Sequence, residues 1–121
     1  MNNLRFYIFN LMPYPHIPPA SEIQSTWVSL SNKYYDPHRG QALYKEYIDQ
    51  LAAAEQFGFD GVAVNEHHAN FYGTMPSPNI IAAMLVQRTT EIPIAIVGNA
   101  IPLHGNPLRV AEEIAMLDVI S

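Results

Sequence analysis

The chain has 121 residues, 49% of them hydrophobic and 14% charged. It is long enough for one small domain with a buried core, and too apolar for wholesale disorder. Its six basic residues are scattered and its formal net charge is -5, which excludes the clustered positive face that nucleic acid requires. There is no cysteine, so disulfides and thiolate metal sites are excluded. No apolar run approaches membrane-spanning length and the first residues make a poor signal peptide, so we expect a cytoplasmic protein.

The first quarter of the chain predicts one strand and one long loop. Leu4–Asn10 is rich in aromatic and branched side chains, which favours a strand. Pro13–Gly40 carries five prolines and has no sustained hydrophobic period, so we expect a loop. A loop of this length is more often a functional lid than filler, although a plain surface excursion is an equal alternative. Its last residues, Asp36–Gly40, form a charged turn that either anchors the loop or lies in solvent.

The middle of the chain predicts a helix followed by a strand. Apolar residues recur at helical spacing over Gln41–Phe57, and Gly58 supplies a left-handed stop. Asp60–Val64 is then a short apolar strand. The apolar positions that repeat at this spacing are Leu43, Tyr44, Tyr47, Ile48, Leu51 and Ala54.

Two further helices each start with a capping residue and a proline. Ser77-Pro78 predicts a helix over Asn79–Thr89, and Asn106-Pro107 begins a third helix. Between them, Ile94–Val97 is a continuous apolar run, typical of a strand buried on both faces. The buried stripe of the third helix is predicted at Leu108, Ala111, Ile114, Ala115 and Leu117.

The order of elements is therefore βαβαβα, which predicts an α/β fold with parallel strands and right-handed crossovers. Three parallel strands leave two open edges, and the sequence ends at Ser121 directly after the third predicted helix, with no helix-stop signal. We therefore expect residues 1–121 to form a partial (β/α)8 barrel, about the first three βα units, rather than a short doubly wound sheet.

An acid and two imidazoles follow the second predicted strand directly: Glu66, His67 and His68. In parallel α/β folds the chemistry lies at this end of the strands. Imidazole exchanges a proton near neutral pH, and a nearby carboxylate can orient it. Two alternatives stay open. One is a structural histidine beside a solvated one. The other is a metal site with Asp60 or Glu66, which is disfavoured because neighbouring side chains on extended backbone point apart.

Polar or small residues also end the other two strands. Asn10 follows the first, and Gly98 and Asn99 follow the third. Without a Cβ, Gly98 lets backbone approach a flat ligand closely or adopt a strained conformation. His104 is more consistent with a turn before Asn106 than with a pocket. No GxGxxG or P-loop pattern occurs, which disfavours a Rossmann-type nucleotide fold.

Taken together, these motifs resemble the N-terminal part of the bacterial luciferase-like flavin-dependent monooxygenases. The resemblance covers the first strand and most of Gln41–Ser121. It is carried by Gly58–Gly61, Asn65–His68, the helix start at Ser77-Pro78, Asn106–Glu113, and Leu117-Asp118 near the end.

The resemblance implies a barrel whose mouth binds reduced flavin, FMN, which reacts with O2 to oxidise a small organic substrate. By position, His67 matches the histidine that acts beside the flavin and Glu66 the adjacent acid. Gly98–Asn99 falls where the family commonly has a non-prolyl cis peptide bond against the flavin ring. We therefore expect Glu66, Gly98 and Asn99 to bind the cofactor, together with Asn10, which ends the first strand at the same mouth. A flavin reductase as partner and a dimer formed through the second and third helices are also implied.

Three alternatives to this assignment differ in chemistry. A dehydrogenase that uses the deazaflavin coenzyme F420 would occupy the same barrel. A metal-dependent barrel hydrolase would use His67 or His68. A truncated barrel without activity would act only through association of its exposed apolar surfaces.

Overall fold

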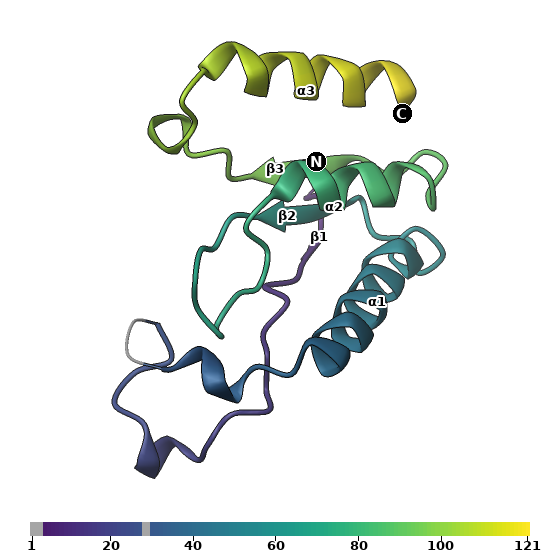
Figure 1. Ribbon diagram of the computed structural model, residues 1–121. Coiled ribbons are helices and arrows are strands. Elements are labelled where there is room, and N and C mark those ends of the chain that lie inside the picture. Colours follow the sequence, from purple (N-terminus) through teal and green to yellow (C-terminus); the bar gives the residue numbers. More distant parts are fainter. Residues whose placement is uncertain (1–3, 28–29) are drawn as a thin grey trace.

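The computed structural model describes residues 4–27 and 30–121, which form three successive βα units (Figure 1). The short 3-10 helices are η1 (Ala20–Glu22), η2 (Asn32–Tyr34) and η3 (Ile101–Leu103). The strands and α-helices are β1 (Tyr7–Phe9), α1 (Pro37–Ala53), β2 (Gly61–Asn65), α2 (Pro78–Val86), β3 (Ile94–Val97) and α3 (Pro107–Ile120).

The three strands form one parallel sheet in the order β1-β2-β3. Ile8 pairs with Val62, which pairs with Ile94 on its other side. The predicted parallel α/β arrangement is confirmed. Because all strands run the same way, their carboxyl ends share one edge of the sheet.

The helices cover one face of this sheet. The buried core joins Val62 and Val64 of β2 to side chains of all three helices, such as Leu51, Leu85 and Leu117. Residues that alternate with the core positions point to the opposite face, where Phe9 of β1 is 49% and Val97 of β3 57% exposed. In Figure 1, α2 lies between α1 and α3. Within the described residues, no helix is both long and apolar enough to cross a membrane.

Helix α1 begins four residues earlier than the sequence pattern predicts. Asp36 is its N-cap: Oδ1 accepts hydrogen bonds from the backbone N–H groups of His38 (2.8 Å) and Arg39 (3.4 Å). Pro37 is the first helical residue, so the predicted charged turn is the cap and first turn of α1. At α2 the predicted cap is in place but not used: Ser77 precedes the helix, and its side chain makes no capping hydrogen bond. Gly58 takes the predicted left-handed conformation, with φ of 75°.

The predicted buried stripe of α3 is only partly correct. Leu117 is buried and Ile114 packs against the core, but Leu108 is 62% exposed. Val110, which the prediction leaves out, is buried instead. Ala111 and Ala115 are exposed. The error has a physical cause: the apolar residues of α3 encircle the helix, so spacing alone does not identify the face that meets α2.

The predicted long loop runs from the end of β1 to Asp36 and is anchored by aromatic side chains. Tyr14 is 2% exposed. Its backbone N–H donates to the carbonyl oxygen of Phe71 (2.9 Å), and its hydroxyl accepts from the N–H of Asp36 (3.0 Å). Its ring packs against Tyr35 and Phe71, with centroid distances of 4.9 and 5.5 Å. The loop is therefore packed onto the connection between β2 and α2. Positions 28 and 29 of the predicted loop lie outside the described residues.

Candidate functional site

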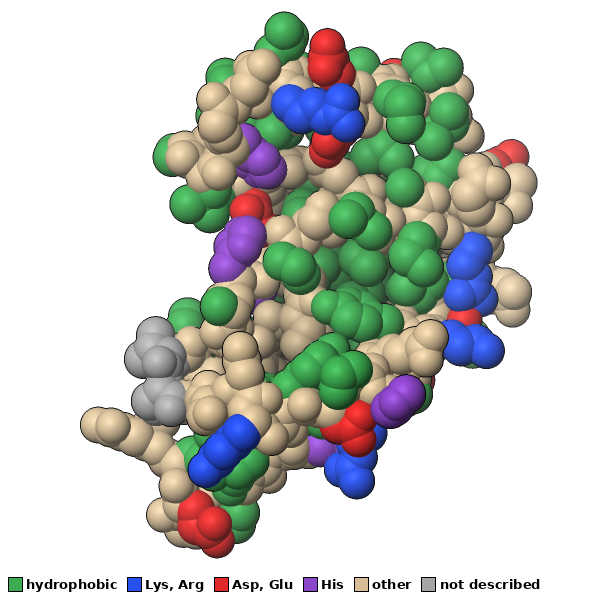
Figure 2. Space-filling view, in the orientation of Figure 1, with side chains coloured by type: hydrophobic (Ala, Val, Ile, Leu, Met, Phe, Trp, Pro, Cys, Tyr) green, Lys and Arg blue, Asp and Glu red, His purple; other side chains and the backbone are tan. Residues whose placement is uncertain are grey.

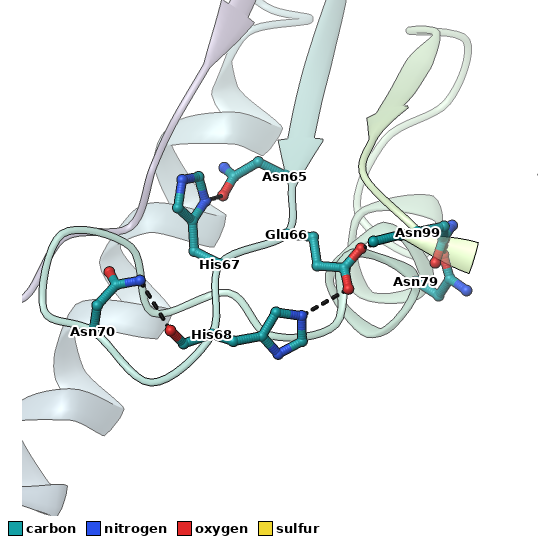
Figure 3. Close-up of polar contacts among 8 residues, drawn as sticks. Asn65, Glu66, His67, His68, Asn70, Asn79 and Asn99 are labelled. Carbon is teal, nitrogen blue, oxygen red and sulfur yellow. Dashed lines mark hydrogen bonds and ion pairs between the residues drawn. The ribbon is translucent and has the colours of Figure 1, made fainter. Parts of the chain in front are cut away.

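The residues predicted to form a site follow the ends of the three strands. Asn10 comes directly after β1, Glu66 and His67 directly after β2, and Gly98 and Asn99 directly after β3. Since the strands are parallel neighbours, these positions lie along one edge of the sheet. The side chains nevertheless make different contacts, and Glu66 and His67 point in different directions (Figure 3).

His67 is paired with an asparagine that ends β2. Its Nδ1 lies 2.6 Å from Oδ1 of Asn65, which is 2% exposed. The Nδ2 group of Asn65 in turn donates to the backbone oxygen of Asn10 (2.7 Å). The backbone N–H of His67 donates to the carbonyl oxygen of Met75 (2.8 Å), which ties the far end of the loop back to β2. The imidazole is therefore oriented by the strand itself.

The loop after β2 closes tightly around the His67 ring. A Cβ on Gly73 would lie 2.8 Å from Cγ of His67, so only glycine allows this approach. Tyr72 meets the ring edge-on with centroids 5.5 Å apart, and Trp27 of the long loop stacks on Tyr72 at 5.0 Å. A cavity of about 200 Å³ beside His67 is also lined by Tyr35 from the long loop. The long loop thus reaches the surroundings of His67.

Glu66 connects the exits of β2 and β3. Its side chain is 6% exposed. Oε2 accepts a hydrogen bond from the N–H of Ala100 (2.6 Å), and Oε1 lies 2.7 Å from Nε2 of His68. Burial raises the pKa of Glu66, but these hydrogen bonds together outweigh it and leave the pKa lowered. At neutral pH the group is therefore a carboxylate that holds the loop after β3.

The loop after β3 is fixed by a close approach and by a polar chain. A Cβ on Gly98 would lie 2.8 Å from Cβ of Glu66, so the missing side chain lets the two strand exits meet. Asn99 adopts a left-handed conformation with φ of 63°, and its Nδ2 donates to Oδ1 of Asn79 (2.8 Å). Asn79 donates in turn to Glu113 of α3 (2.8 Å).

The expected non-prolyl cis peptide bond at Gly98–Asn99 is wrong for this structure, because no cis peptide bond occurs among the described residues. The chain changes direction there through the left-handed conformation of Asn99. Asparagine tolerates that conformation better than most residues do, and the hydrogen bond to Asn79 supports it.

The side chain of Asn10 is turned away from the other candidates. Its Nδ2 donates to Gln50 of α1 (3.1 Å), and its Oδ1 accepts from the N–H of Met12 (2.8 Å). Asn10 contributes its backbone carbonyl oxygen to the site, which accepts a hydrogen bond from Nδ2 of Asn65. The role of its side chain in cofactor binding therefore stays a prediction.

The possible metal ligands lie apart. Asp60 accepts from the N–H of Phe6 (2.7 Å) at the amino end of β2, the opposite end from Glu66. The two neighbouring histidines diverge: His67 pairs with Asn65 and His68 with Glu66 (Figure 3). Among the described residues, no group of three histidine, aspartate or glutamate side chains could hold an ion.

His104 lies in a bend after η3, as predicted.

Two residues of this network were not predicted as site residues: Asn65 and Asn79. Both are buried polar side chains, 2% and 7% exposed. A signal was present in the sequence, since Asn65 ends an otherwise apolar strand and Asn79 lies among the apolar residues of α2. A polar group at such a place needs a partner. Spacing alone did not reveal which partner each would find.

The profile of the family described as "Luciferase-like monooxygenase" matches residues 23–121. The chain is 34% identical over 77 residues to the alkanal monooxygenase beta chain of Vibrio harveyi, covering 64% of this chain and 24% of that protein. It is 29% identical over 86 residues to the oxygenase component of the flavin-dependent trigonelline monooxygenase of Acinetobacter baylyi. That match covers 71% of this chain and 24% of the relative.

A solved structure shares the fold: the oxygenating constituent of 3,6-diketocamphane monooxygenase from Pseudomonas putida, a type II Baeyer-Villiger monooxygenase in complex with FMN. The TM-score is 0.67 at 19% identity, over 98% of this chain and 27% of that one. The likeness confirms the predicted partial barrel fold. The chain spans about a quarter of the length of the curated relatives that it matches. Because the family profile matches well over half of its residues, this chain belongs to the luciferase-like monooxygenase family.

Proposed function

We propose that this protein is a flavin-dependent monooxygenase that uses reduced FMN and O2 to oxidise a small organic substrate. The observation that carries the proposal is the strand-oriented His67 at the carboxyl edge of the sheet, in a chain of this family. Two relatives support the cofactor: one is named flavin-dependent, and the structural neighbour is in complex with FMN. This favours FMN over a deazaflavin. We further propose that residues 1–121 supply the first three βα units of the barrel.

The proposed roles follow from the contacts at the strand ends. His67 would touch the flavin or its substrate, because its ring is held at the edge by Asn65. Glu66 would act mainly by holding the loop after β3 through Ala100. Gly98 and Asn99 would present backbone to the flat ring at the exit of β3, while the missing side chain of Gly98 leaves room for Glu66. When bound, reduced FMN would supply the electrons that activate O2.

A flavin reductase is the proposed partner protein. The relative from Acinetobacter baylyi is named an oxygenase component and the structural neighbour an oxygenating constituent. An oxygenating component that consumes reduced flavin needs a second component to supply it. We therefore propose that this protein receives reduced FMN from a separate reductase.

A dimer through α2 and α3 is the proposed assembly. Ile80 and Met84 of α2 are 63% and 45% exposed, and Met116 and Val119 of α3 are 63% and 84% exposed. Figure 2 shows hydrophobic side chains gathered over α2. Exposed apolar patches of this kind mark association surfaces. Sedimentation equilibrium tests the proposal: a dimer that Met84→Glu dissociates would support it, and a monomer at high concentration would contradict it.

The function is tested by anaerobic titration of the protein with reduced FMN, followed by turnover with O2. We expect saturable binding, and we expect His67→Ala to lower turnover by at least about 100-fold, the scale of a lost acid–base or positioning group. His38→Ala is the matched control, because His38 is exposed in the first turn of α1. Absence of flavin binding, or full turnover in His67→Ala, would overturn the proposal.

A further inference from the structure

We propose that Asn65 fixes the tautomer of His67, so that the neutral ring carries its proton on Nδ1 and presents Nε2 as a hydrogen-bond acceptor. The inference rests on the proposed function, in which His67 touches the flavin or its substrate. It adds Asn65 as a positioning residue, one that acts through His67 rather than on the ligand.

The first step is the orientation of the Asn65 amide. The side chain is 2% exposed, and Nδ2 lies 2.7 Å from the backbone oxygen of Asn10. A carbonyl oxygen can only accept a hydrogen bond, so the NH2 group must face it. The reverse orientation would bring two oxygens together in a buried place. Oδ1 of Asn65 therefore faces His67.

The second step assigns the proton on the ring. Oδ1 of Asn65 can only accept, so Nδ1 of His67, 2.6 Å away, must donate. A neutral imidazole has one N–H, which leaves the lone pair on Nε2. In the part of the chain that the structure describes, Nε2 has no hydrogen-bond partner, and Figure 3 shows it turned away from Asn65. It can accept from an N–H or O–H group of a ligand.

The third step is that the ring cannot easily turn over. The backbone of His67 is tied to Met75 (2.8 Å), and Tyr72 lies edge-on to the ring. Gly73 passes so close that a Cβ there would lie 2.8 Å from Cγ of His67. A ring flip would replace Nδ1 by a carbon and leave the buried Oδ1 of Asn65 without its donor, which is unfavourable. One ring orientation and one tautomer are thus selected together.

Long-range 1H–15N correlation spectra of the 15N-labelled full-length protein, at about pH 8 where imidazole is neutral, test the proposal without flavin. The His67 signals are assigned by their loss in His67→Gln. We expect the Nδ1–H tautomer to exceed the Nε2–H tautomer about tenfold, which corresponds to one hydrogen bond. Asn65→Leu, of similar volume, should bring the ratio to about one or below, whereas His38→Ala should leave it unchanged.

A wild-type spectrum in which Nε2–H equals or exceeds Nδ1–H would overturn the proposal, and it depends only on a folded His67→Gln for the assignment. An unchanged excess in folded Asn65→Leu would overturn it as well. The result of this tautomer measurement is independent of the result of the flavin titration. The expected tautomer without flavin binding would remove only the proposed function, and flavin binding with the opposite tautomer would remove only this inference.

Discussion

Glu66 is the residue on which two loops of the site depend. Its carboxylate accepts from the N–H of Ala100 in one loop and lies against His68 in the other. The side chain is 6% exposed, whereas Ala100 is an exposed residue, so water can partly replace the carboxylate as the partner of its N–H. The effect of a substitution then comes mainly from the loss of the charge-assisted hydrogen bonds of the carboxylate.

Glu66→Gln keeps an oxygen that can accept from Ala100 but loses the negative charge, so it should lower the free energy of unfolding by about 1–3 kcal/mol at pH 7, the cost of weakening hydrogen bonds to a mostly buried charged group. The lowered pKa of Glu66 adds a pH dependence. A carboxyl whose pKa is lower in the folded protein stabilises it above the ordinary value of 4.5 and loses that contribution as pH falls through the lowered pKa. The difference between the wild type and Glu66→Gln should thus shrink in acid.

Urea denaturation of both proteins from pH 7 down to about pH 3, across the ordinary range of carboxyl titration, measures this difference. Glu22→Gln is the matched control, since Glu22 is exposed in η1. We expect Glu22→Gln to change the free energy of unfolding by less than about 0.5 kcal/mol. A Glu66 difference that stays constant across the pH range would contradict a role for the ionised carboxylate.

The helix starts show which features of the elements follow from sequence. Three Pro-initiated helices share one device, a capping residue before a proline: Asp36-Pro37, Ser77-Pro78 and Asn106-Pro107. Only Asp36 and Asn106 use their side chains as caps. The sequence pattern predicts a good cap at Ser77 and only a turn at Asp36, because the helical period of α1 becomes regular only after its first turn.

Asp36→Ala should lower the free energy of unfolding by about 0.5–2 kcal/mol, the usual effect of losing a cap. Ser77→Ala, at the same position of a similar helix, should cost less because no capping bond is lost. Thermal or urea denaturation of the two variants gives the comparison. A larger loss in Ser77→Ala than in Asp36→Ala would contradict the assignment of the caps.

Gly98→Ala should disturb the meeting of the β2 and β3 exits. The added Cβ would lie 2.8 Å from Cβ of Glu66 and 3.3 Å from Pro78, and we expect a loss of about 1–3 kcal/mol from overpacking. Gly105→Ala is the control, because nothing lies within 4 Å of a Cβ there. Equal unfolding free energies for the two variants would show that the strand exits are not closely packed at Gly98.

The parallel direction of the strands could be predicted because it follows from the alternation of strands and helices along the sequence. The Ile94–Val97 strand is observed with the predicted bounds. The contacts of Asn10 and Asn99 could not be predicted, because each depends on a partner from a distant segment, Gln50 in one case and Asn79 in the other. The sequence spacing correctly placed these residues at the carboxyl edge of the sheet, but it did not give the direction of their side chains.

The whole molecule has one covered and one open face of the sheet. The helices bury one face, while Tyr7, Phe9 and Val97 on the other are 39%, 49% and 57% exposed. In a (β/α)8 barrel that second face is the packed interior, and ligands lie at its carboxyl end. Asn65 belongs to this face, since it pairs in register with Val97. It connects the interior row of residues to His67 at the edge.

The central claim is that the carboxyl edge of the sheet, beside His67 and the Gly98–Asn99 turn, is where the flavin lies. A crystal structure of the full-length protein with FMN bound tests it most directly. The account predicts the flavin ring within contact distance of the His67 imidazole and of the backbone at Gly98. A ring bound instead at the opposite edge, near Glu55 and the Thr90–Ile92 backbone that its carboxylate holds, would contradict it.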